Sequence, residues 1–243
     1  MSGAAPRLSV VIPAYNEERR LGGTLGRIHE WLRSRNETFE ILVVDDGSTD
    51  GTASLARGFA REHPGVEVLA PGRNRGKGAA VRDGFARTRG ELVAFSDADL
   101  STPIEELEPM RAALEDGVDL VIASRGLPES NLAVRQAWYR ENMGKLFNRI
   151  VRLITGIPFR DTQCGFKLLR GDAARAAAAA MREDGFSFDV ELILLVRRAG
   201  GRVREFPVTW RHVDDSRVSP IVDSLRMLRA LPAIVARTGR YRD

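Results

Sequence analysis

Cysteine, histidine and long apolar runs are scarce in this chain of 243 residues. The single cysteine, Cys164, excludes an internal disulfide bond and favours a reducing compartment. No apolar run reaches the length of about 18 residues that a membrane-spanning helix needs. Charged residues begin too close to the first methionine for a secretory signal peptide. These absences predict a soluble or peripheral protein of the cytoplasm.

Charge is placed unevenly along the sequence, although 43% hydrophobic and 29% charged residues are ordinary for a globular protein. The formal net charge is +4. Residues 125–155 and residues 216–243 each carry six arginine or lysine residues against two acidic ones, so they hold the excess of positive charge. We expect anionic partners for these two segments alone.

The first 125 residues alternate short β-branched runs with helical stretches. Strands are expected at residues 8–13, 39–45, 66–69, 92–96 and 120–123, and helices at about residues 17–35, 52–63, 78–89 and 103–116. This alternation predicts an α/β fold with a mostly parallel sheet covered by helices on both faces. Ligands bind such sheets beyond the carboxyl ends of the strands. One crevice is therefore expected to hold Tyr15 and residues 45–48 and 97–99.

The pattern changes after residue 125. The expected elements are a helix over residues 134–154, a polar segment at 161–167, a helix near 188–199, a strand near 203–210 and a helix at about 220–238. Pro232 should kink or break the last helix, because proline cannot donate a backbone hydrogen bond. Residues 1–243 are interpreted as one domain with two halves that meet near residue 125.

Asp97 and Asp99 stand directly after the expected strand at residues 92–96. Two carboxylates separated by one residue can hold Mg²⁺ or Mn²⁺, which prefer hard oxygen ligands and often share them with substrate phosphates. The ion would neutralise charge on a departing diphosphate. A capping aspartate followed by a turn is the structural alternative. The position at a strand end favours the metal site.

Three other segments carry groups suited to a nucleotide. Asp45 and Asp46 can accept hydrogen bonds from a base or a ribose, and Tyr15 offers an aromatic face to a base. The loop at residues 73–78, which includes Lys77, enters a helix, where backbone N–H groups and nearby cations suit phosphate. A polar turn, a packed tyrosine and a solvated loop are the structural alternatives. The loop does not match the P-loop pattern, so ATP chemistry is not expected.

Taken together, VVIPAYNEE (residues 10–18), ILVVDDGSTDGT (41–52), NRGKGAAVRDG (74–84) and SDADL (96–100) resemble the inverting nucleotide-sugar glycosyltransferases of the GT-A fold. DTQCGFK (161–167) and FDVEL (188–192) are more specific and are similar to segments of dolichyl-phosphate β-glucosyltransferases and their mannosyltransferase relatives. The resemblance covers about residues 7–230. It implies a Rossmann-like, mostly parallel central sheet with C-terminal amphipathic helices. It also implies a nucleotide-sugar half over about residues 1–125 and an acceptor half over about residues 126–243.

The resemblance further implies roles for single residues. The donor would bind to Pro13, Tyr15, Glu17, Asp45, Asp46, Lys77, Asp97, Ala98 and Arg217, with Tyr15 near the base, Glu17 and Asp46 on uridine, and Asp97 on the ribose or sugar side. Asp99, with Asp97 beside it, would bind the metal, and the catalytic residues would be Asp99, Asp161, Arg125 and Arg135. Two positions depart from the mannosyltransferases. Arg217 replaces a lysine, which changes the geometry at the diphosphate, and Ser101 replaces a glutamine that often reaches the metal.

Two expected helices combine an apolar stripe with basic residues, a pattern typical of helices in the membrane interface. The first stripe comprises Tyr139, Met143, Leu146, Phe147, Ile150, Val151 and Ile154, with Lys145, Arg149 and Arg152 on another face. The second comprises Ile221, Leu225, Leu228, Pro232 and Val235, with Arg226, Arg229 and Arg237 nearby. A helix packed on the core with a solvated basic back is the alternative for each. We expect membrane contact, with some apolar positions packed inward.

A phosphate acceptor needs no strong general base. The second pKa of a phosphate monoester is about 6, so the group is largely dianionic at neutral pH and needs cations to position it. Arg125, Arg135 and Arg140 suit this role, because arginine binds phosphate in a bidentate way. The three histidines lie outside the chemical motifs. Asp161 could orient the acceptor, approach the metal or the sugar, serve as a base, or act as a structural cap.

The expected activity is metal-dependent, inverting transfer of a hexosyl group to a polyprenyl phosphate at the cytoplasmic face of a membrane. Glucose from UDP-glucose is favoured by the resemblance alone. The alternatives are GDP-mannose as donor, a soluble saccharide or small-molecule acceptor, a nucleotide-sugar-binding scaffold, and a nucleotidyltransferase. No nucleic-acid partner is expected, and a homodimer is left open.

Overall fold

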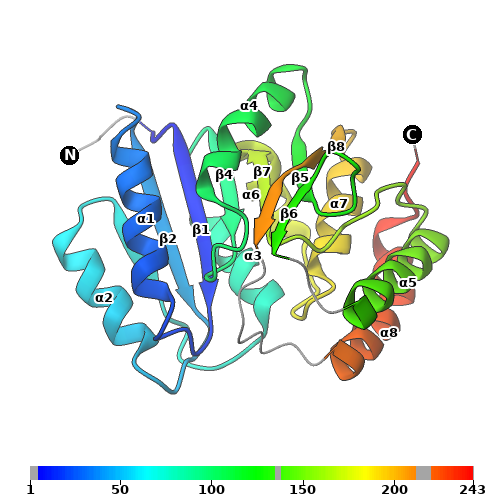
Figure 1. Ribbon diagram of the computed structural model, residues 1–243, viewed down its shortest axis with the longest axis horizontal. Coiled ribbons are helices and arrows are strands. Elements are labelled where there is room, and N and C mark those ends of the chain that lie inside the picture. Colours follow the sequence, from blue (N-terminus) through cyan, green and yellow to red (C-terminus); the bar gives the residue numbers. More distant parts are fainter. Residues whose placement is uncertain (1–4, 135–137, 212–219, 243) are drawn as a thin grey trace.

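The computed structural model describes residues 5–134, 138–211 and 220–242. A seven-stranded sheet forms its centre, and the carboxyl ends of β1 and β2 lie at the lower edge in Figure 1. Across the sheet, the strands are β3 (Val66–Leu69), β2 (Phe39–Asp45), β1 (Leu8–Ala14), β4 (Leu92–Ser96), β7 (Phe166–Arg170), β5 (Leu120–Ser124) and β8 (Val203–Pro207). Within the described residues, β7 is the one strand of this sheet that runs antiparallel to its neighbours.

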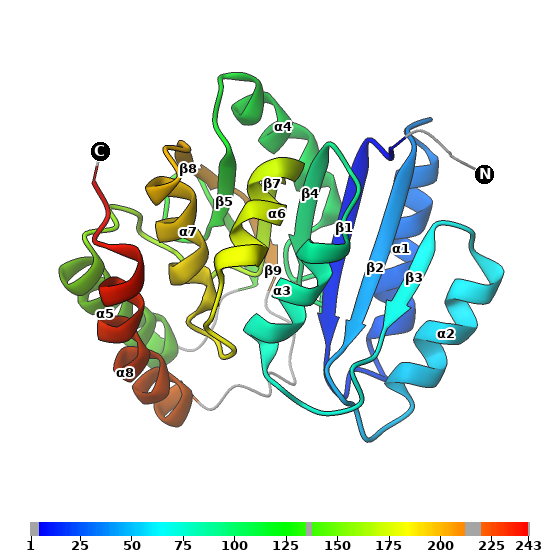
Figure 2. The same ribbon diagram turned by 180° about the vertical axis from the view of Figure 1, so that it is seen from behind.

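Helices cover both faces of the sheet. One face carries α1 (Leu21–Arg33), α2 (Thr52–Glu62), the 3₁₀ turn η1 (Ile104–Glu106), α4 (Leu107–Glu115) and a small sheet of β6 (Asn131–Val134) and β9 (Thr209–Arg211). The other face carries α3 (Lys77–Arg87), α5 (Trp138–Thr155), α6 (Gly171–Ala180), α7 (Phe188–Arg198) and α8 (Pro220–Thr238), as Figure 2 shows.

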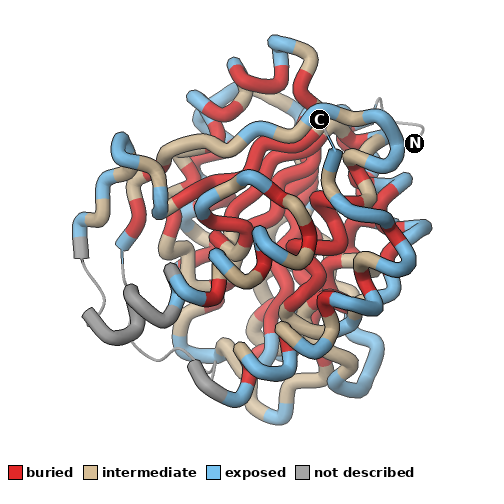
Figure 3. The backbone as a smooth tube through the Cα atoms, turned by 90° about the vertical axis from the view of Figure 1, so that its right-hand side faces the viewer, coloured by how far each residue is buried: buried red, intermediate tan, exposed pale blue. Residues whose placement is uncertain are grey.

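The apolar character of the strands follows from this double cover. In β1, Val10 and Ile12 belong to the core on the α1 side, whereas Val11 belongs to the core on the α3 side. Successive side chains of a strand point to opposite faces, so a strand buried on both faces is apolar at nearly every position. Figure 3 shows the buried strands running through the centre of the molecule. Each fully buried Val, Leu or Ile side chain contributes about 1.5–3 kcal/mol to stability.

The structure confirms the α/β fold and the five strands expected in the first half. The second half differs from the expectation at three places. The segment at residues 161–167 runs into β7 because its apolar continuation pairs with β4 and β5. The expected strand at 203–210 is two strands in different sheets. Of the expected helix at 134–154, Val134 belongs to β6, and the described helix α5 comprises Trp138–Thr155.

Of the predicted kink or break at Pro232, the break is wrong, because α8 continues through this residue to Thr238. Pro232 is exposed, while Met227, Leu231 and Ile234 are buried in the core that α8 shares with α5 and α7. Packing on both sides of the proline therefore keeps the helix continuous.

Helix α3 packs so closely on β1 and β2 that Gly84 has no room for a side chain. A Cβ atom there would lie 2.4 Å from Val11 Cγ1 and 3.1 Å from Val44 Cγ2. We expect Gly84→Ala to lower the free energy of unfolding by about 1–3 kcal/mol, because overpacking outweighs a helix-propensity gain of about 1 kcal/mol. Urea denaturation measures the change.

The matched control is Gly58→Ala in α2, where the added Cβ would come no closer than 3.9 Å to Arg61. This substitution should raise the free energy of unfolding by about 0.5–1 kcal/mol. Equal stabilisation by both substitutions would contradict the close packing of α3.

Candidate functional site: a cavity at the carboxyl edge of the sheet

A cavity of about 560 Å³ opens at the carboxyl edge of the sheet. It is lined by Pro13, Ala14, Tyr15, Glu17, Arg20, Asp46, Asn74, Gly76, Lys77, Ala80, Asp97, Ala98, Asp99, Gly185, Phe186, Val222, Asp223 and Arg226. These residues follow β1, β2 and β4, begin α3, precede α7 and begin α8. The crevice expected from the strand ends is therefore present, with α8 as an additional wall.

The turn after β4 presents Asp97 and Asp99 to this cavity. Leu100 adopts a left-handed backbone conformation with φ of 48°, which tightens the turn, and its N–H donates to the Asp97 carbonyl. Asp99 Oδ1 accepts a hydrogen bond of 3.0 Å from the Ser101 N–H. The Thr24 hydroxyl of α1 donates to the Ala98 carbonyl at 2.6 Å. Thus the turn is fixed while both carboxylates still line the cavity.

The segment before β7 holds Asp97 in position. The Asp97 N–H donates to the Gly165 carbonyl at 2.9 Å. A Cβ atom on Gly165 would lie 2.0 Å from Asp97 Oδ2, so only glycine leaves room for the carboxylate in this position. DTQCGFK and SDADL, which are far apart in the sequence, thus form one unit.

Asp97 forms an ion pair with Lys77, the first residue of α3, at 2.6 Å between Oδ1 and Nζ. Burial alone would lower the pKa of Lys77, but the charges of Asp97 and Asp189 raise the pKa above its ordinary value. Lys77 is therefore a cation at neutral pH. It brings a fixed positive charge to the floor of the cavity.

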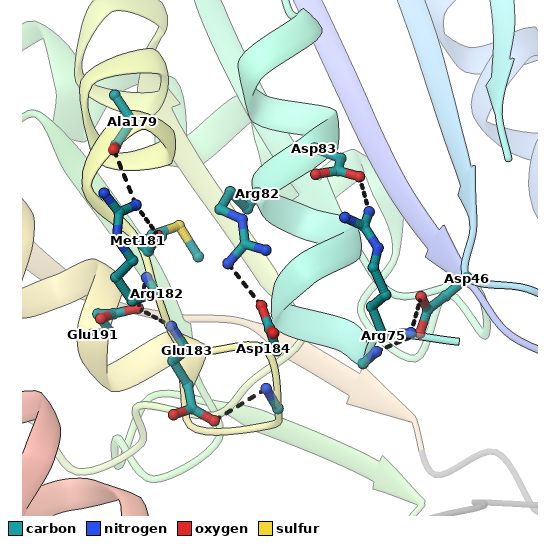
Figure 4. Close-up of polar contacts among 12 residues, drawn as sticks. Asp46, Arg75, Arg82, Asp83, Ala179, Met181, Arg182, Glu183, Asp184 and Glu191 are labelled. Carbon is teal, nitrogen blue, oxygen red and sulfur yellow. Dashed lines mark hydrogen bonds and ion pairs between the residues drawn. The ribbon is translucent and has the colours of Figure 1, made fainter. Parts of the chain in front are cut away.

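Asp46 holds the loop that leads into α3 (Figure 4). Its two carboxylate oxygens accept hydrogen bonds of 2.8 Å from the N–H groups of Arg75 and Gly76. Its neighbour Asp45 is buried, accepts from the Ser48 N–H at 3.3 Å and is not among the lining residues of the cavity. Asp46 thus holds the loop before α3 and Asp45 supports the turn, while the binding of uridine by Asp46 stays a prediction.

Two backbone N–H groups at the start of α3, which were expected to suit a phosphate, are bonded within the protein. The N–H groups of Gly78 and Ala79 donate to the Asp184 carbonyl at 2.8 and 3.2 Å. Arg82 reinforces this contact through an ion pair of 2.7 Å with the Asp184 side chain, as Figure 4 shows. The loop before α7 therefore caps this part of α3.

Buried Glu191 holds that capping loop in place. Its Oε2 accepts hydrogen bonds of 2.9 and 2.7 Å from the N–H groups of Arg182 and Glu183 (Figure 4). Its Oε1 pairs with Arg237 of α8 at 2.9 Å. One carboxylate of FDVEL thus connects the Phe186 wall of the cavity to α8.

Glu17 and Tyr15 lie on the β1 side of the cavity. Arg20 binds both carboxylate oxygens of Glu17 at 2.8 Å, and the Glu17 N–H donates to the Thr52 hydroxyl at 2.7 Å. Tyr15 is 39% exposed, which leaves its ring accessible from the cavity. An aromatic face and an oriented acidic group are suited to a nucleobase.

Arg125 and Asp161 form a second polar unit outside the lining of the cavity. Arg125 donates from Nε and a terminal nitrogen to Asp161 at 2.7 and 3.0 Å, and from its backbone N–H at 3.0 Å. The Gln163 N–H adds a fourth bond of 3.1 Å. Arg125 also lies over the Trp210 ring.

Burial alone would raise the pKa of Asp161, but the charge and the hydrogen bonds of Arg125 lower its pKa below the ordinary value. An ionised carboxylate that accepts four hydrogen bonds is a poor proton acceptor. Among the roles left open for Asp161, the geometry favours orienting Arg125.

The structure thus brings eight of the expected residues to one cavity: Pro13, Tyr15, Glu17, Asp46, Lys77, Asp97, Ala98 and Asp99. Arg135 and Arg217 lie outside the described residues, and the side chain of Arg140 is not described. The sequence interpretation missed Arg20, Phe186 and Asp223 and did not place Arg226 here, whereas Asn74 belongs to the loop at residues 73–78 that it had named. The signals were weak: Arg20 follows Glu17 by three residues, and Arg226 was among the basic residues beside an apolar stripe that was interpreted as facing lipid.

A divalent cation fits the donor set at the end of β4. In the part of the chain that the structure describes, no three His, Cys, Asp or Glu side chains gather into a metal site. Mg²⁺ commonly takes one or two carboxylates and completes its shell with substrate phosphates and water. Asp99, whose Oδ1 carries one backbone hydrogen bond, is a suitable carboxylate.

Among the described helices, none is long and apolar enough to cross a membrane.

A Rossmann-like sheet with paired carboxylates at a central strand end defines the class of GT-A glycosyltransferases. The chain belongs to glycosyl transferase family 2, whose family model matches residues 9–176. It is 36% identical to a dolichyl-phosphate beta-glucosyltransferase of Drosophila melanogaster, over 95% of this chain and 74% of that protein. The mouse protein of that name is 33% identical over 97% of this chain and 78% of its own length.

Solved structures confirm the GT-A fold. Glucosyl-3-phosphoglycerate synthase of Mycobacterium tuberculosis, crystallised with UDP, has a TM-score of 0.67 at 22% identity and covers 98% of this chain and 82% of its own. The same enzyme was crystallised with Mn²⁺ and UDP-glucose. Mannosyl-3-phosphoglycerate synthase of Rubrobacter xylanophilus has a TM-score of 0.66 at 24% identity and covers 96% of this chain and 73% of its own.

The Arg125–Asp161 pair should make stability depend on acid pH. We expect Asp161→Asn to lower the free energy of unfolding by about 3–5 kcal/mol at neutral pH, because it leaves a buried guanidinium without its carboxylate. Folding lowers the pKa of Asp161, so its contribution is complete above the ordinary value of about 4 and is lost as the pH falls through the lowered pKa. Urea denaturation at several pH values measures both effects.

The control is Glu67→Gln, which removes an exposed ion pair with Arg87 and should change stability by less than about 1 kcal/mol. Wild type should lose stability below about pH 4 more steeply than the Asp161 variant. Equal acid slopes would show that Asp161 is not held ionised by Arg125.

Proposed function

We propose that this chain transfers glucose from UDP-glucose to a polyprenyl phosphate, with inversion at the sugar carbon and with a divalent cation. The observation that carries the proposal is the cavity that brings Tyr15, the Asp97–Lys77 pair and Asp99 together. It occurs in a chain that is similar, over 95% of its length, to a dolichyl-phosphate beta-glucosyltransferase.

Donor recognition follows from the chemistry of the cavity walls. The Tyr15 ring can stack on uracil beside Glu17, which Arg20 holds in place. Lys77 and Arg226 bring positive charge toward the diphosphate, and Asp97 can accept hydrogen bonds from sugar or ribose hydroxyls. Asp46 lines the same cavity and fixes the loop that carries Lys77.

Mg²⁺ or Mn²⁺ bound at Asp99 would supply charge neutralisation to the departing diphosphate. Asp99 is oriented for this purpose by the Ser101 N–H. In this scheme Asp97, already paired with Lys77, contributes to the metal mainly through its charge.

The acceptor phosphate is its own nucleophile. One of its oxygens forms a bond to the sugar C1 while the bond from C1 to the UDP oxygen breaks, so that UDP leaves with the electron pair. Displacement from the opposite side converts an α-linked donor into a β-linked product. Arg125, oriented by Asp161, would position the acceptor dianion, and the same role is proposed for Arg135, with Arg217 at the diphosphate.

The proposed acceptor is a lipid, so the protein has to contact a membrane. Helices α5 and α8 carry a surface that suits this contact. The two helices lie side by side in Figures 1 and 2. In the described chain, the exposed large apolar side chains apart from Tyr15 are Leu146 and Leu153 of α5 and Val222 and Leu225 of α8. We call these four side chains with exposed Arg149, Arg152, Arg226 and Arg229 the lipid face.

The expected apolar stripes are only partly exposed. Phe147 and Val151 pack into the core, as do Met227, Leu231 and Ile234, which the predicted α8 stripe left out. The lipid face is therefore limited to the exposed positions of the two helices. Peripheral attachment, the cytoplasmic side, the two functional halves and a homodimer stay predictions.

The activity itself is tested with purified protein, radiolabelled UDP-glucose, Mg²⁺ or Mn²⁺ and a short polyprenyl phosphate in detergent. Label should move to the organic phase, and EDTA should abolish the transfer. We expect Asp99→Ala to lower the rate by at least about 100-fold, because a bound metal contributes several kcal/mol to catalysis. Asp116→Ala, at the exposed end of α4, is the control and should leave the rate unchanged.

The outcomes separate the alternatives. Full activity of Asp99→Ala in metal-containing buffer would exclude Asp99 as the metal ligand. Transfer from GDP-mannose but not UDP-glucose would change the donor. Transfer to phosphoglyceric acid but not to the lipid would replace the proposed acceptor.

The lipid face is tested by sedimentation with vesicles that contain anionic lipid. Leu146→Ser with Leu153→Ser should reduce the bound fraction at least about tenfold, because burying a leucine side chain contributes about 1.5–3 kcal/mol. These side chains are 59% and 77% exposed, so folding should be unaffected. Ala180→Ser, exposed on α6, is the matched control. Equal binding by all three proteins would exclude this face.

A further inference from the structure

Two neighbours of different chemistry hold the Arg125 side chain. Asp161 binds the edge of the guanidinium, which donates from Nε and one terminal nitrogen at 2.7 and 3.0 Å. Trp210 lies against its face, with the guanidinium carbon over the indole ring and 5.5 Å from the ring centroid. The face of an aromatic ring is negative, so it attracts a cation in this position. Arginine can make both contacts at once because its charged group is planar.

The register of the sheet places Trp210 beside Arg125. Strand β8 runs parallel to β5 with Pro207 opposite Ser124, so the two chain segments leave the sheet at the same point. Arg125 is the next residue after β5, and the chain that leaves β8 continues into β9, which contains Trp210. The division of this segment into two strands therefore brings an indole ring to the arginine that follows β5.

Backbone contacts on both sides of Trp210 fix the position of its ring. The Thr209 N–H donates to Glu106 Oε1 at 3.0 Å, and the Arg211 N–H donates to the Ser101 carbonyl at 2.9 Å. Trp210 itself is 8% exposed and packs in the core on the α1 side of the sheet. A ring that is fixed in this way restricts where a charged side chain in contact with it can lie.

The same chain segment also fixes Asp161. Glu205 of β8 accepts a hydrogen bond of 2.8 Å from the Asp161 N–H. Both neighbours of Arg125 therefore depend on the segment from Glu205 to Trp210. In the part of the chain that the structure describes, the second terminal nitrogen of Arg125 has no hydrogen bond, and the side chain is 32% exposed. This nitrogen is the part of the guanidinium that a ligand can reach.

We propose that Trp210 is a positioning residue for the acceptor, whose ring fixes the face of the Arg125 guanidinium so that its remaining N–H groups meet the acceptor phosphate. This inference rests on the proposed function, which assigns Arg125 to the acceptor dianion. Trp210 needs no contact with either substrate for this role. A guanidinium that is fixed before the acceptor arrives loses less conformational entropy on binding.

The alternative is that Trp210 only fills the core. Trp210→Leu removes the aromatic face and keeps an apolar side chain. A positioning role predicts that the KM for a short polyprenyl phosphate rises about tenfold, in the range of a cation–π contact shielded from water, and that kcat changes by less than about threefold. UDP affinity, measured by calorimetry, should change by less than about twofold, because Trp210 and Arg125 lie outside the lining of the donor cavity.

Trp31→Leu is the matched control. Trp31 of α1 is 7% exposed, and Arg35 lies over its ring at 4.7 Å from the centroid. The substitution therefore removes the same kind of contact from a similarly buried ring outside the lining of the cavity. Both variants should lower the unfolding temperature, whereas only Trp210→Leu should raise the acceptor KM.

A comparison of backgrounds separates positioning of Arg125 from a general loosening of the core. Arg125→Gln with Asp161→Asn removes both charges of the pair, which often preserves stability, and thermal unfolding confirms that each protein is folded. In this background Trp210→Leu should change kcat/KM for the acceptor by less than about twofold, because there is no guanidinium to position. An equal loss of kcat/KM in both backgrounds, or a wild-type KM in Trp210→Leu, would overturn the proposal.

Trp210→Phe is a second variant that decides the question if Trp210→Leu does not fold. Its smaller aromatic face attracts a cation less strongly than indole, so the acceptor KM should rise about threefold. A folded Trp210→Phe protein with the wild-type KM would then exclude the positioning role. If Arg125→Gln with Asp161→Asn leaves the acceptor KM unchanged, the assignment of Arg125 in the proposed function fails instead.

Discussion

The pairing of antiparallel β7 between β4 and β5 is the constraint on which the rest of the site depends. Because β7 runs against its neighbours, residues 161–165 arrive at the edge where β4 and β5 end. Asp97 can then donate its N–H to Gly165, and Asp161 can bind Arg125 with both oxygens. A parallel strand in this place would bring the same residues to the opposite edge of the sheet. The position of the DTQCGFK segment in the site therefore depends on the direction of β7.

Hydrogen bonds within the protein distinguish the carboxylates that hold the structure around the cavity from the groups that face its interior. The acidic groups of Asp46, Asp161 and Glu191 each accept from backbone N–H groups and hold a loop or an arginine. Asp99 has one such bond and faces the cavity, and Lys77 reaches the same space from α3. A buried carboxylate that holds the structure would lose too much hydrogen-bond free energy if it exchanged these partners for a ligand. An acidic residue in a motif can therefore belong to either kind of group, and only its contacts in the structure show which kind it is.

Helix α8 joins the two sides of the proposed reaction. Val222 and Arg226 line the cavity and are also exposed at the surface, while Leu231 and Ile234 hold the helix on α7 and α5. Its far end is fixed to the loop before α7 through Arg237 and Glu191. In the proposed reaction, this placement of α8 would set the distance between a donor in the cavity and an acceptor phosphate at a lipid surface.

The sequence by itself determined the α/β fold, the strands of the first half and most of the cavity. Apolar runs of four to seven residues bury both faces of a strand, and the polar residues after them must meet at one edge. Only the tertiary structure decided that the segment at 161–167 enters a central strand, that Asp184 caps α3 and that Pro232 leaves α8 continuous. Each of these depends on partners far away in the chain. The local sequence shows which polar groups a segment contains. Long-range packing decides which of these groups are already hydrogen-bonded within the protein.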